Sequence, residues 1–390
     1  MFGGGFRTAR PEIAWLPGDG IGSEVLQAAR RVLDESGFEA SYIPGDIGWE
    51  FWRKEGTPLP DRTIELLRST DCAFLGAVTS KPNADAMREL PERLRAKGAR
   101  YSGALLRIRR MFDLYTCLRP CRAYPGNPGN RTEGIDITIF RENTEGMYSG
   151  AEWDKIPQEL YNIRGMERVP RQAAITVRAV TRKASMRIAN AAFERAAKFP
   201  RAPRAPKATG AGNGCGRRRV TAVHKANVMR ATDGVFLGAA REVAGKYPEI
   251  EYEEMLVDAC AMQLVRDPLR FDIIVTTNLF GDILSDLCAQ LVGGMGFAPS
   301  ANLGDDYAMF EPSHGSAPDI AGKGIANPVA AVLSAKLMLE WLGEKDRADR
   351  VDRAVAEVVR EGSVRTPDMG GTDGTMAMAA AIAVKLKHGT

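Results

Sequence analysis

Two carboxylates stand four residues apart in residues 278–286, which read N-L-F-G-D-I-L-S-D. The short apolar run before them predicts a buried strand, followed by a turn and a helix. On that helix Asp282 and Asp286 would share one face, where like charges repel. A divalent cation, which prefers hard oxygen ligands, or a basic substrate-binding cluster would compensate them. On these residues alone a second interpretation stays open. In it, Asp286 is a solvated helix residue, and Asp282, near the start of the helix, interacts favourably with the helix dipole.

Arginine is concentrated in residues 102–120, and guanidinium groups suit the bidentate binding of carboxylates. The group consists of Arg107, Arg109, Arg110 and Arg119, joined further along by Arg141. A helix at the start of this segment would bring three residues onto the face of Arg109, one or two turns before it: Ser102, Leu105 and Leu106. An acidic substrate is one interpretation of this segment, and a basic solvated face beside an apolar seam is the other.

Two further groups that can move protons follow predicted strands. Residues 135–140 alternate as a strand, and Tyr148 comes after it in the segment R-E-N-T-E-G-M-Y. Lys225 follows the predicted strand 220–223, and a lysine near carboxylates can act as a base with a shifted pKa. Asp258 supplies another acidic position ahead of the paired carboxylates. For Tyr148, a structural side chain with its hydroxyl at the surface is the alternative.

A glycine-rich turn at residues 17–22, P-G-D-G-I-G, connects a predicted strand at 12–16 to a predicted helix at 23–33. Glycines at such a turn allow backbone N–H groups to approach a phosphate at the start of the helix. The spacing is neither G-x-G-x-x-G nor that of a P-loop. A tight turn without any cofactor role is therefore an equal interpretation.

Strands and helices alternate along the chain, which predicts an α/β protein. The further strands are predicted at 72–78, 173–178 and 271–275, and the further helices at 61–69, 181–198, 329–342 and 347–360. Residues 81–100 read as a polar surface excursion. Residues 200–219 are rich in Pro, Gly and Arg, which predicts a mobile surface loop. Since no linker separates two halves, domains built from discontinuous segments are allowed.

The composition is that of a globular protein without a nucleic-acid or membrane partner. The chain has 390 residues, 44% hydrophobic and 26% charged, with a net charge of only +4. No apolar run approaches the roughly 18 residues of a membrane span. The six cysteines are scattered, without C-x-x-C spacing, and indicate neither a zinc site nor a disulfide framework. We therefore expect a cytoplasmic protein.

Several segments occur in a characteristic order: P-G-D-G-I-G, L-R-P with its upstream arginine, R-E-N-T-E-G-M-Y, H-K-A-N-V, N-L-F-G-D-I-L-S-D and E-P-S-H-G-S-A-P-D-I-A-G-K-G-I-A-N-P. Over nearly the whole chain they resemble the isocitrate and isopropylmalate dehydrogenases, which are metal-dependent β-decarboxylating dehydrogenases. The resemblance implies an α/β, doubly wound sheet, with a large cofactor-binding domain from residues 1–114 and 293–390. Residues 115–292 would form a smaller domain for substrate, metal and dimerisation, with a flexible insertion at 200–219.

The resemblance also implies a reaction, the oxidation of a (2R)-hydroxy acid followed by loss of its 3-carboxylate as CO2. Three arginines would hold the substrate carboxylates, namely Arg109, Arg119 and Arg141. Three aspartates would bind Mg2+ or Mn2+, namely Asp258, Asp282 and Asp286. Lys225 would take the hydroxyl proton, and Tyr148 would protonate the carbon left by decarboxylation. In this family the lysine and one aspartate, here Lys225 and Asp258, come from the partner subunit, so a homodimer is the smallest expected active unit.

The cofactor implied by the resemblance is NAD. Asp319 would accept a hydrogen bond from the adenosine ribose and would repel a 2′-phosphate. NADP-selective relatives carry Lys-Tyr where this chain has Asp319 and Ile320. The other matched adenosine contacts are His314, Gly315 and Asn327.

The substrate is predicted from the residues before Arg109. Leu105 and Leu106 resemble the isopropylmalate enzymes, whose substrate carries an apolar group, and 3-isopropylmalate is our leading expectation. Ser102 replaces their usual glutamate, and H-K-A-N-V-M-R-A-T-D-G is closer to the isocitrate and homoisocitrate branch. D-malate or tartrate, and an unusual 3-substituted malate, are further alternatives. From other classes, a non-catalytic regulatory subunit would be expected to lack these ligands, and RNA binding through 200–219 is disfavoured because the tract has no aromatic residues.

Overall fold

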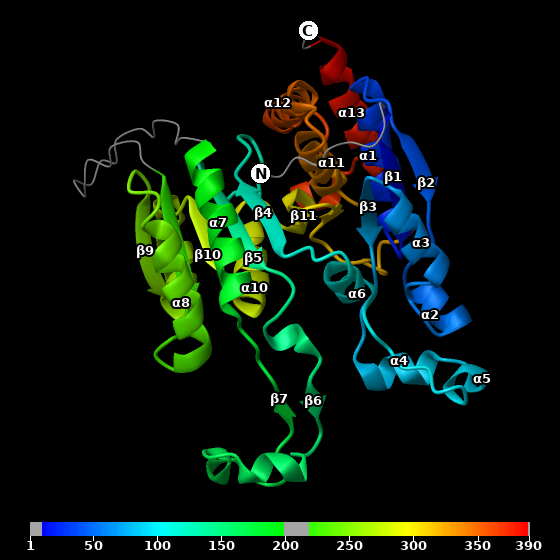
Figure 1. The fold of residues 1–390 in the computed structure, drawn as a ribbon. Coiled ribbons are helices and arrows are strands. Elements are labelled where there is room, and N and C mark those ends of the chain that lie inside the picture. The colour runs from blue at the N-terminus through cyan, green and yellow to red at the C-terminus, as the bar shows by residue number, and fades with distance from the viewer. Residues whose placement is uncertain (1–9, 199–217, 389–390) are drawn as a thin grey trace.

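A computed structural model describes residues 10–198 and 218–388 of the chain, and in them a ten-stranded sheet carries helices on both faces (Figure 1). The strand order is β2-β1-β3-β12-β11-β4-β5-β10-β8-β9. β4 runs antiparallel to both of its neighbours and β11 does the same, while the remaining neighbours pair in parallel. The predicted α/β, doubly wound class is confirmed, with a mixed rather than purely parallel sheet.

The two halves of the sheet come from different parts of the sequence. The first half uses both ends of the chain: β1 Glu12–Gly18, β2 Ser41–Pro44, β3 Cys72–Ala77, β11 Pro299–Leu303 and β12 Ala308–Pro312. The second half uses the middle: β4 Thr116–Arg122, β5 Asp136–Glu142, β8 Arg219–His224, β9 Glu251–Leu256 and β10 Ile273–Thr276. The halves meet where β11 pairs with β4.

The helices form two layers. One layer covers what we call the α11 face of the sheet: α1 Gly22–Glu35, α7 Arg182–Lys198, α8 Arg230–Ala244, α11 Val329–Trp341, α12 Lys345–Glu361 and α13 Thr375–His388. The other covers the α10 face: α3 Asp61–Ser69, α6 Ala104–Met111, α9 Val257–Arg266 and α10 Asn278–Leu291. Shorter helices at the edge are α2 Trp49–Glu55, α4 Asn83–Glu89 and α5 Glu92–Arg95. None of the described helices is long and apolar enough to cross a membrane.

An arm projects from the sheet between β5 and α7 (Figure 1). It contains a two-stranded sheet of β6 Glu152–Trp153 and β7 Ile175–Thr176, with short 3-10 turns beyond it. The strand predicted at 173–178 is therefore only two residues long. The surrounding residues are largely exposed, so they bury little apolar surface that would extend the pairing.

The structure adds elements that the sequence patterns missed. A third helix, α13, closes the chain after the two that were predicted. The other missed elements are the helices α2, α8 and α9 and the strands β2, β4, β6, β9, β11 and β12. The surface excursion at 81–100 contains α4 and α5. The tract 200–219 lies outside the described residues except for Arg218 and Arg219, and Arg219 opens β8.

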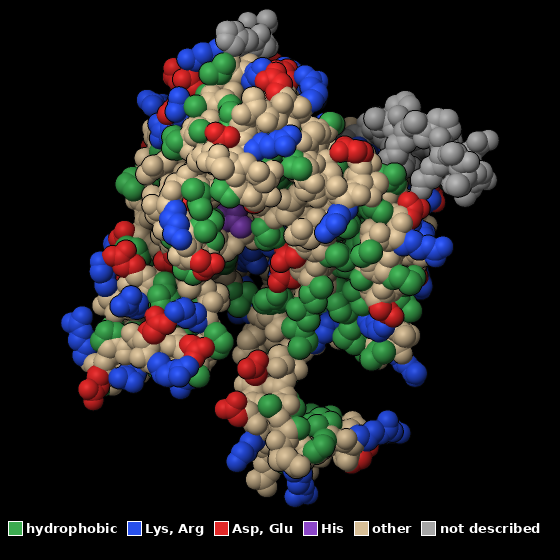
Figure 2. Space-filling view, turned by 180° about the vertical axis from the view of Figure 1, so that it is seen from behind, with side chains coloured by type: hydrophobic (Ala, Val, Ile, Leu, Met, Phe, Trp, Pro, Cys, Tyr) green, Lys and Arg blue, Asp and Glu red, His purple; other side chains and the backbone are tan. Residues whose placement is uncertain are grey.

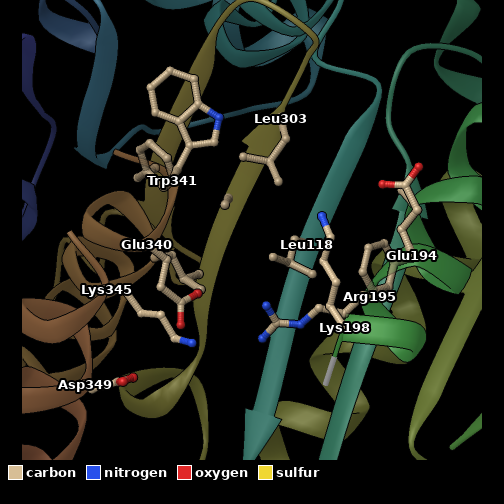
Figure 3. A pocket seen from close by; sticks show the side chains of 14 residues that line it. Leu118, Glu194, Arg195, Lys198, Leu303, Glu340, Trp341, Lys345 and Asp349 are labelled. Carbon is tan, nitrogen blue, oxygen red and sulfur yellow. The ribbon is translucent and has the colours of Figure 1, made fainter. Parts of the chain in front are cut away.

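On the α11 face, a cavity of about 250 Å³ separates α7 from α11 (Figure 3). Leu118 and Leu303 belong to its apolar lining, and Arg195, Lys345 and Glu340 to its charged lining. The motifs with predicted catalytic or binding roles contribute almost no residues to the lining of this cavity. Arg119, Arg141 and Asp282, which were predicted to hold substrate and metal, lie on the other face.

Candidate active site

Strand alternation directs the predicted arginines to the α10 face. On β5, Ile137 and Ile139 pack in the cluster under α9 and α10, while Phe140 faces the α11 layer. Arg141 follows Ile139 by two residues and therefore points the same way. Arg119 on β4 precedes Cys121 of the same cluster by two residues. Both guanidinium groups consequently lie under α10.

Arg141 and Asp282 form the centre of the site. Arg141 is 1% exposed, and its Nη1 donates to Asp282 Oδ1 at 2.6 Å. Its Nε and Nη2 donate to Asn278 Oδ1 at 3.0 and 2.7 Å. The Tyr148 hydroxyl donates to the other oxygen of Asp282 at 2.6 Å. One carboxylate thus holds a buried arginine and the predicted proton donor together.

Arg119 extends this group along α10. Its Nη1 donates to Ser285 Oγ at 2.6 Å and to Asp286 Oδ1 at 3.1 Å, and it lies 3.5 Å from Asp282 Oδ1. The two predicted metal-ligating carboxylates therefore share one guanidinium group. Their side chains occupy one face of the helix, as the spacing of four predicted.

Arg109 reaches the site from α6, on the other half of the sheet. Its Nη2 donates to Glu311 Oε1 at 3.2 Å, and both side chains are buried. Asn302 Nδ2 donates to the same carboxylate oxygen at 2.8 Å. Neither Glu311 nor Asn302 was assigned a role from the sequence. Glu311 stands in the E-P-S-H-G segment, and its membership of that segment was the signal available in the sequence.

The three guanidinium groups lie close enough to affect one another. Burial lowers the pKa of Arg141, and the charges of Arg109 and Arg119 lower it further. The buried Nε atoms of Arg109 and Arg119 find no hydrogen-bond acceptor among the described residues. Buried donors of this kind are costly unless paired. They fit an acidic ligand that brings its own carboxylate oxygens.

The pKa values of the two aspartates of α10 shift in opposite directions. Burial raises the pKa of Asp282, but Arg141, the Tyr148 hydroxyl and Arg119 outweigh it, so the net pKa is lowered. Burial raises the pKa of Asp286, and the charge of Asp282 adds to the increase against the effect of Arg119. The repulsion between the two carboxylates is one that a bound divalent cation would relieve, so this pair fits a metal site.

The remaining predicted metal ligand lies elsewhere in the chain. Asp258, at the start of α9, accepts a hydrogen bond from Lys225 Nζ at 2.5 Å, and this bond is the main reason why its pKa is lowered. Among the described residues, no group of three or more Asp, Glu, His and Cys side chains could hold a metal. One chain therefore brings Lys225 to Asp258 but does not bring either of them to Asp282.

The residues predicted to select the substrate surround the start of α6. The helix begins at Ala104, so Ser102 lies before it, exposed, rather than on the helical face of Arg109. Leu105 and Leu106 are both half-buried, and Leu105 packs against the core beneath α3 and α6. The apolar seam beside Arg109 is present.

The residues predicted to bind the cofactor lie in or at the end of the loop between β12 and α11. Burial lowers the pKa of His314, whose Nδ1 lies 3.0 Å from the carbonyl oxygen of Gly315. Asp319 is exposed and Ile320 is half-buried. Asn327 is buried and its Nδ2 donates to Asp368 Oδ2 at 2.9 Å, so its side chain also holds the loop in place.

The glycine-rich turn after β1 packs against this loop. The Ile21 N–H donates to the Ser316 carbonyl at 2.9 Å and the Asp19 N–H to the Ala77 carbonyl at 2.8 Å. A Cβ on Gly20 would lie 1.9 Å from the Ser316 oxygen. The N–H groups of Asp19, Ile21 and Gly22 already have backbone partners, so they are not available to a phosphate. The interpretation as a tight turn is the one that the contacts favour.

Fold and site together define a class of protein, an α/β enzyme that handles small acidic substrates. A sequence model described as isocitrate/isopropylmalate dehydrogenase matches residues 12–382. The chain belongs to the isocitrate/isopropylmalate dehydrogenase family and is a decarboxylating dehydrogenase, an oxidoreductase.

Relatives on different branches of the family are similarly close. An isocitrate/homoisocitrate dehydrogenase of Thermus thermophilus is 44% identical over 96% of this chain and 98% of its own length. The 3-isopropylmalate dehydrogenase of Methanothermobacter thermautotrophicus is 41% identical over 96% and 98%. The crystal structure of isocitrate dehydrogenase from Methylococcus capsulatus matches with a TM-score of 0.81 at 39% identity, covering 97% of this chain and 99% of that one.

Proposed function

We propose that the protein catalyses the NAD- and Mg2+- or Mn2+-dependent oxidative decarboxylation of a 3-substituted (2R)-malate, with 3-isopropylmalate as the leading substrate. The observation that carries the reaction is that Arg119 and Arg141 pair with the carboxylates of α10, while Arg109, held by Glu311, lies close enough to lower the pKa of Arg141. The Nε atoms of Arg109 and Arg119 have no acceptor among the described residues. The half-buried Leu105 and Leu106 beside Arg109 support an apolar substituent.

The chain's own residues would divide the work as follows. Arg109, Arg119 and Arg141 would hold and orient the substrate carboxylates by charge-assisted hydrogen bonds. Lys225 would accept the hydroxyl proton. Burial raises the pKa of Tyr148, and its hydrogen bond to Asp282 raises it further. The phenol therefore keeps its proton at neutral pH and can deliver it to the carbon from which CO2 departs.

Two bound groups would supply the remaining chemistry. A divalent cation held by Asp282 and Asp286, with Asp258 of a second copy, would act as a Lewis acid on the substrate oxygens. NAD would accept the hydride, with its adenosine end near His314 and Asn327. The exposed Asp319 carboxylate supports NAD over NADP because it would repel a 2′-phosphate.

A homodimer is the proposed active unit. Lys225 and Asp258 pair with each other within one chain and are not gathered with Asp282, which is what a site completed by a second copy requires. Figure 2 shows hydrophobic side chains gathered on the half of the molecule that carries α8, α9 and α10. Met262, Val265 and Ile283 on α9 and α10 are 56%, 66% and 59% exposed. Such a patch favours association with a second copy.

The substrate is the finer question. Relatives with names from both the isopropylmalate and the isocitrate/homoisocitrate branches match about equally, so similarity does not select one. Isocitrate or homoisocitrate is the second candidate, favoured by the exposed Ser102, where isopropylmalate enzymes carry glutamate. D-malate, tartrate and an unusual 3-substituted malate follow.

The deciding experiment compares kcat/KM for 3-isopropylmalate, isocitrate, homoisocitrate, D-malate and tartrate, with NAD and with NADP at fixed Mg2+. We expect 3-isopropylmalate with NAD to lead. A tenfold or greater preference for isocitrate would overturn the leading substrate. The absence of metal-dependent NADH formation with every acid would overturn the catalytic proposal and favour a regulatory subunit.

We keep two further expectations as proposals. The division into residues 1–114 with 293–390 and residues 115–292 is supported by the sheet, whose halves come from these segments and meet between β11 and β4. A cytoplasmic location follows from the composition alone. Partners other than the substrate, the cofactors and a second copy are not proposed.

A further inference from the structure

The loop that carries Lys225 is fixed by a carboxylate with no access to solvent. Asp233, in the first turn of α8, is 0% exposed. Its Oδ2 accepts a hydrogen bond from the backbone N–H of Lys225 at 2.5 Å. The N–H groups of Val228 and Met229 donate back to the Lys225 carbonyl. The chain around Lys225 is therefore a closed turn with a buried anion bound to its first N–H group.

Arg178 is the counter-ion of that carboxylate. Its Nη1 lies 2.6 Å from Asp233 Oδ1, and the Arg178 side chain is 12% exposed. The same guanidinium donates to Thr232 Oγ1 and, at 3.2 Å, to Thr277 Oγ1. Its carbon lies 5.7 Å from the centre of the Phe280 ring. Arg178 stands on the chain returning from the arm, so it connects three separate segments.

The segment that contains Thr277 leads into α10, the helix that carries Asp282 and Asp286. Thr277 immediately precedes α10, and its hydroxyl makes no capping bond to the helix. It accepts the Arg178 N–H instead. Asp282 follows one turn into the same helix. The ion pair therefore ties the Lys225 turn to the start of α10.

A buried ion pair is weak evidence for stability, because desolvation of two charges offsets most of their attraction. A role in fixing geometry explains the pair better. We propose that Asp233 and Arg178 are positioning residues that set the place of the Lys225 turn relative to α10. This rests on the proposed function, in which Lys225 acts as the base. Neither residue touches substrate or cofactor.

The test uses the full-length protein and the isosteric change Asp233→Asn. We expect kcat to fall by about 10²-fold, since displacing a catalytic group by an ångström has effects of that order. KM for the hydroxy acid should stay within about threefold, because the arginines that bind carboxylates are unchanged. Hydrogen exchange at the Lys225 amide should accelerate by about tenfold, because its acceptor loses the charge.

The matched control is Glu253→Gln. It breaks another ion pair of the same half of the sheet, Arg270 Nη2 to Glu253 Oε2 at 3.1 Å, which does not touch the Lys225 turn. It should lower stability without changing kcat or exchange at Lys225. Arg178→Lys should recover kcat to within about tenfold of the wild type, while Arg178→Gln should resemble Asp233→Asn. If Asp233→Asn does not fold, the two Arg178 variants carry the test.

Unchanged kcat and unchanged exchange at Lys225, with only a lower melting temperature, would overturn the proposal. So would an equal loss of kcat in Glu253→Gln. If the wild-type protein turns over none of the acids, the proposed function fails. Exchange at the Lys225 amide then still decides whether the pair fixes the turn.

Discussion

At the residue scale, most of the chemistry depends on groups that serve two partners. Asp282 accepts from Arg141 and from Tyr148, so the carboxylate that would bind a cation also orients the proton donor. Arg119 is shared between Ser285 and Asp286 in the same way. A substitution at any of these positions removes more than one contact, which makes single effects non-additive.

The metal site is tested most directly at Asp286. Its side chain is 57% exposed, so Asp286→Asn should change the stability of the metal-free protein by less than about 1 kcal/mol. In the wild type, Mn2+ at about 100 times its dissociation constant should stabilise the fold by about 2.7 kcal/mol, which amounts to several degrees in melting temperature. Asp286→Asn should abolish that shift. The exposed helix carboxylate Asp34, when changed to Asn, should preserve it; an equal Mn2+ response in both variants would exclude Asp286 as a ligand.

Cofactor preference is tested at Asp319 and Ile320. The double variant Asp319→Lys, Ile320→Tyr should lower the ratio of kcat/KM for NAD to that for NADP by about 10² or more. The physical reason is that the change removes a repulsion with the 2′-phosphate and supplies a cation in its place. KM for the hydroxy acid should not move. A ratio that stays at the wild-type value would show that the ribose is bound elsewhere.

At the element scale, the β1–α1 turn and the β12–α11 loop support each other. The close packing of Gly20 on Ser316 explains why glycine is required there, at a backbone φ of +57°. The loop that it holds contains His314 and Asp319. The packing of this turn can therefore influence cofactor binding through the loop.

Gly20→Ala should destabilise the protein by at least about 2 kcal/mol more than Gly37→Ala. Both positions have a positive φ, which costs an alanine roughly 1 kcal/mol, but only the Cβ at Gly20 would meet another atom. Thermal unfolding of the two variants measures the difference, and KM for NAD should rise only in Gly20→Ala. Equal losses in the two variants would remove the packing explanation.

The Lys225 turn should also make the fold sensitive to acid through His224. Burial lowers the pKa of His224, although Glu254 and Asp233 oppose the change, and its Nδ1 accepts the Ala226 N–H at 3.1 Å. A histidine whose pKa is lowered in the folded state contributes stability that is fully present above its unfolded-state pKa of 6.5. This stability is lost as the pH falls through the lower, folded-state pKa. His224→Asn keeps an acceptor without the titration. Unfolding free energies between pH 7.5 and 5 should fall less steeply in that variant, and identical slopes would contradict the assignment.

At the scale of the whole molecule, Lys225 and Asp258 pair with each other and are not gathered with Asp282 and Asp286 among the described residues. All four residues belong to the half of the sheet built from β4, β5, β8, β9 and β10. Within one chain, however, the pair Lys225 and Asp258 is not brought together with the pair Asp282 and Asp286. Two copies with exposed apolar faces on α9 and α10 can bring the two pairs together by symmetry.

Complementation between two inactive variants tests this arrangement. Lys225→Ala and Asp282→Asn should each be inactive as homodimers. Refolded together in equal amounts, they should recover about a quarter of the wild-type activity. Half of the dimers are then mixed, and each mixed dimer has one site without either defect. A mixture as inactive as its components, although native mass spectrometry finds mixed dimers, would place both residues in the same chain's site.

Local elements could be predicted from the sequence better than contacts between distant residues. The spacing of Asp282 and Asp286 and the strand-turn-helix around them were predictable because four-residue spacing and apolar runs are local properties. α13 and β11 were missed because the first is apolar on most sides and the second is buried throughout, so neither shows amphipathic periodicity. Glu311 could not be paired with Arg109 from sequence, since 202 residues separate them.

By itself, the sequence determined the class of fold, the residue types of the site and the resemblance to a family, because these depend on local patterns and on the order of motifs. Only the tertiary structure showed that the glycine turn packs on the loop after β12 and that Arg109 is held by Glu311. It also decided that Lys225 is fixed by the buried Asp233 and Arg178. The physical reason is that hydrogen bonds and ion pairs form between atoms that the fold brings within about 3 Å, whatever their separation along the chain.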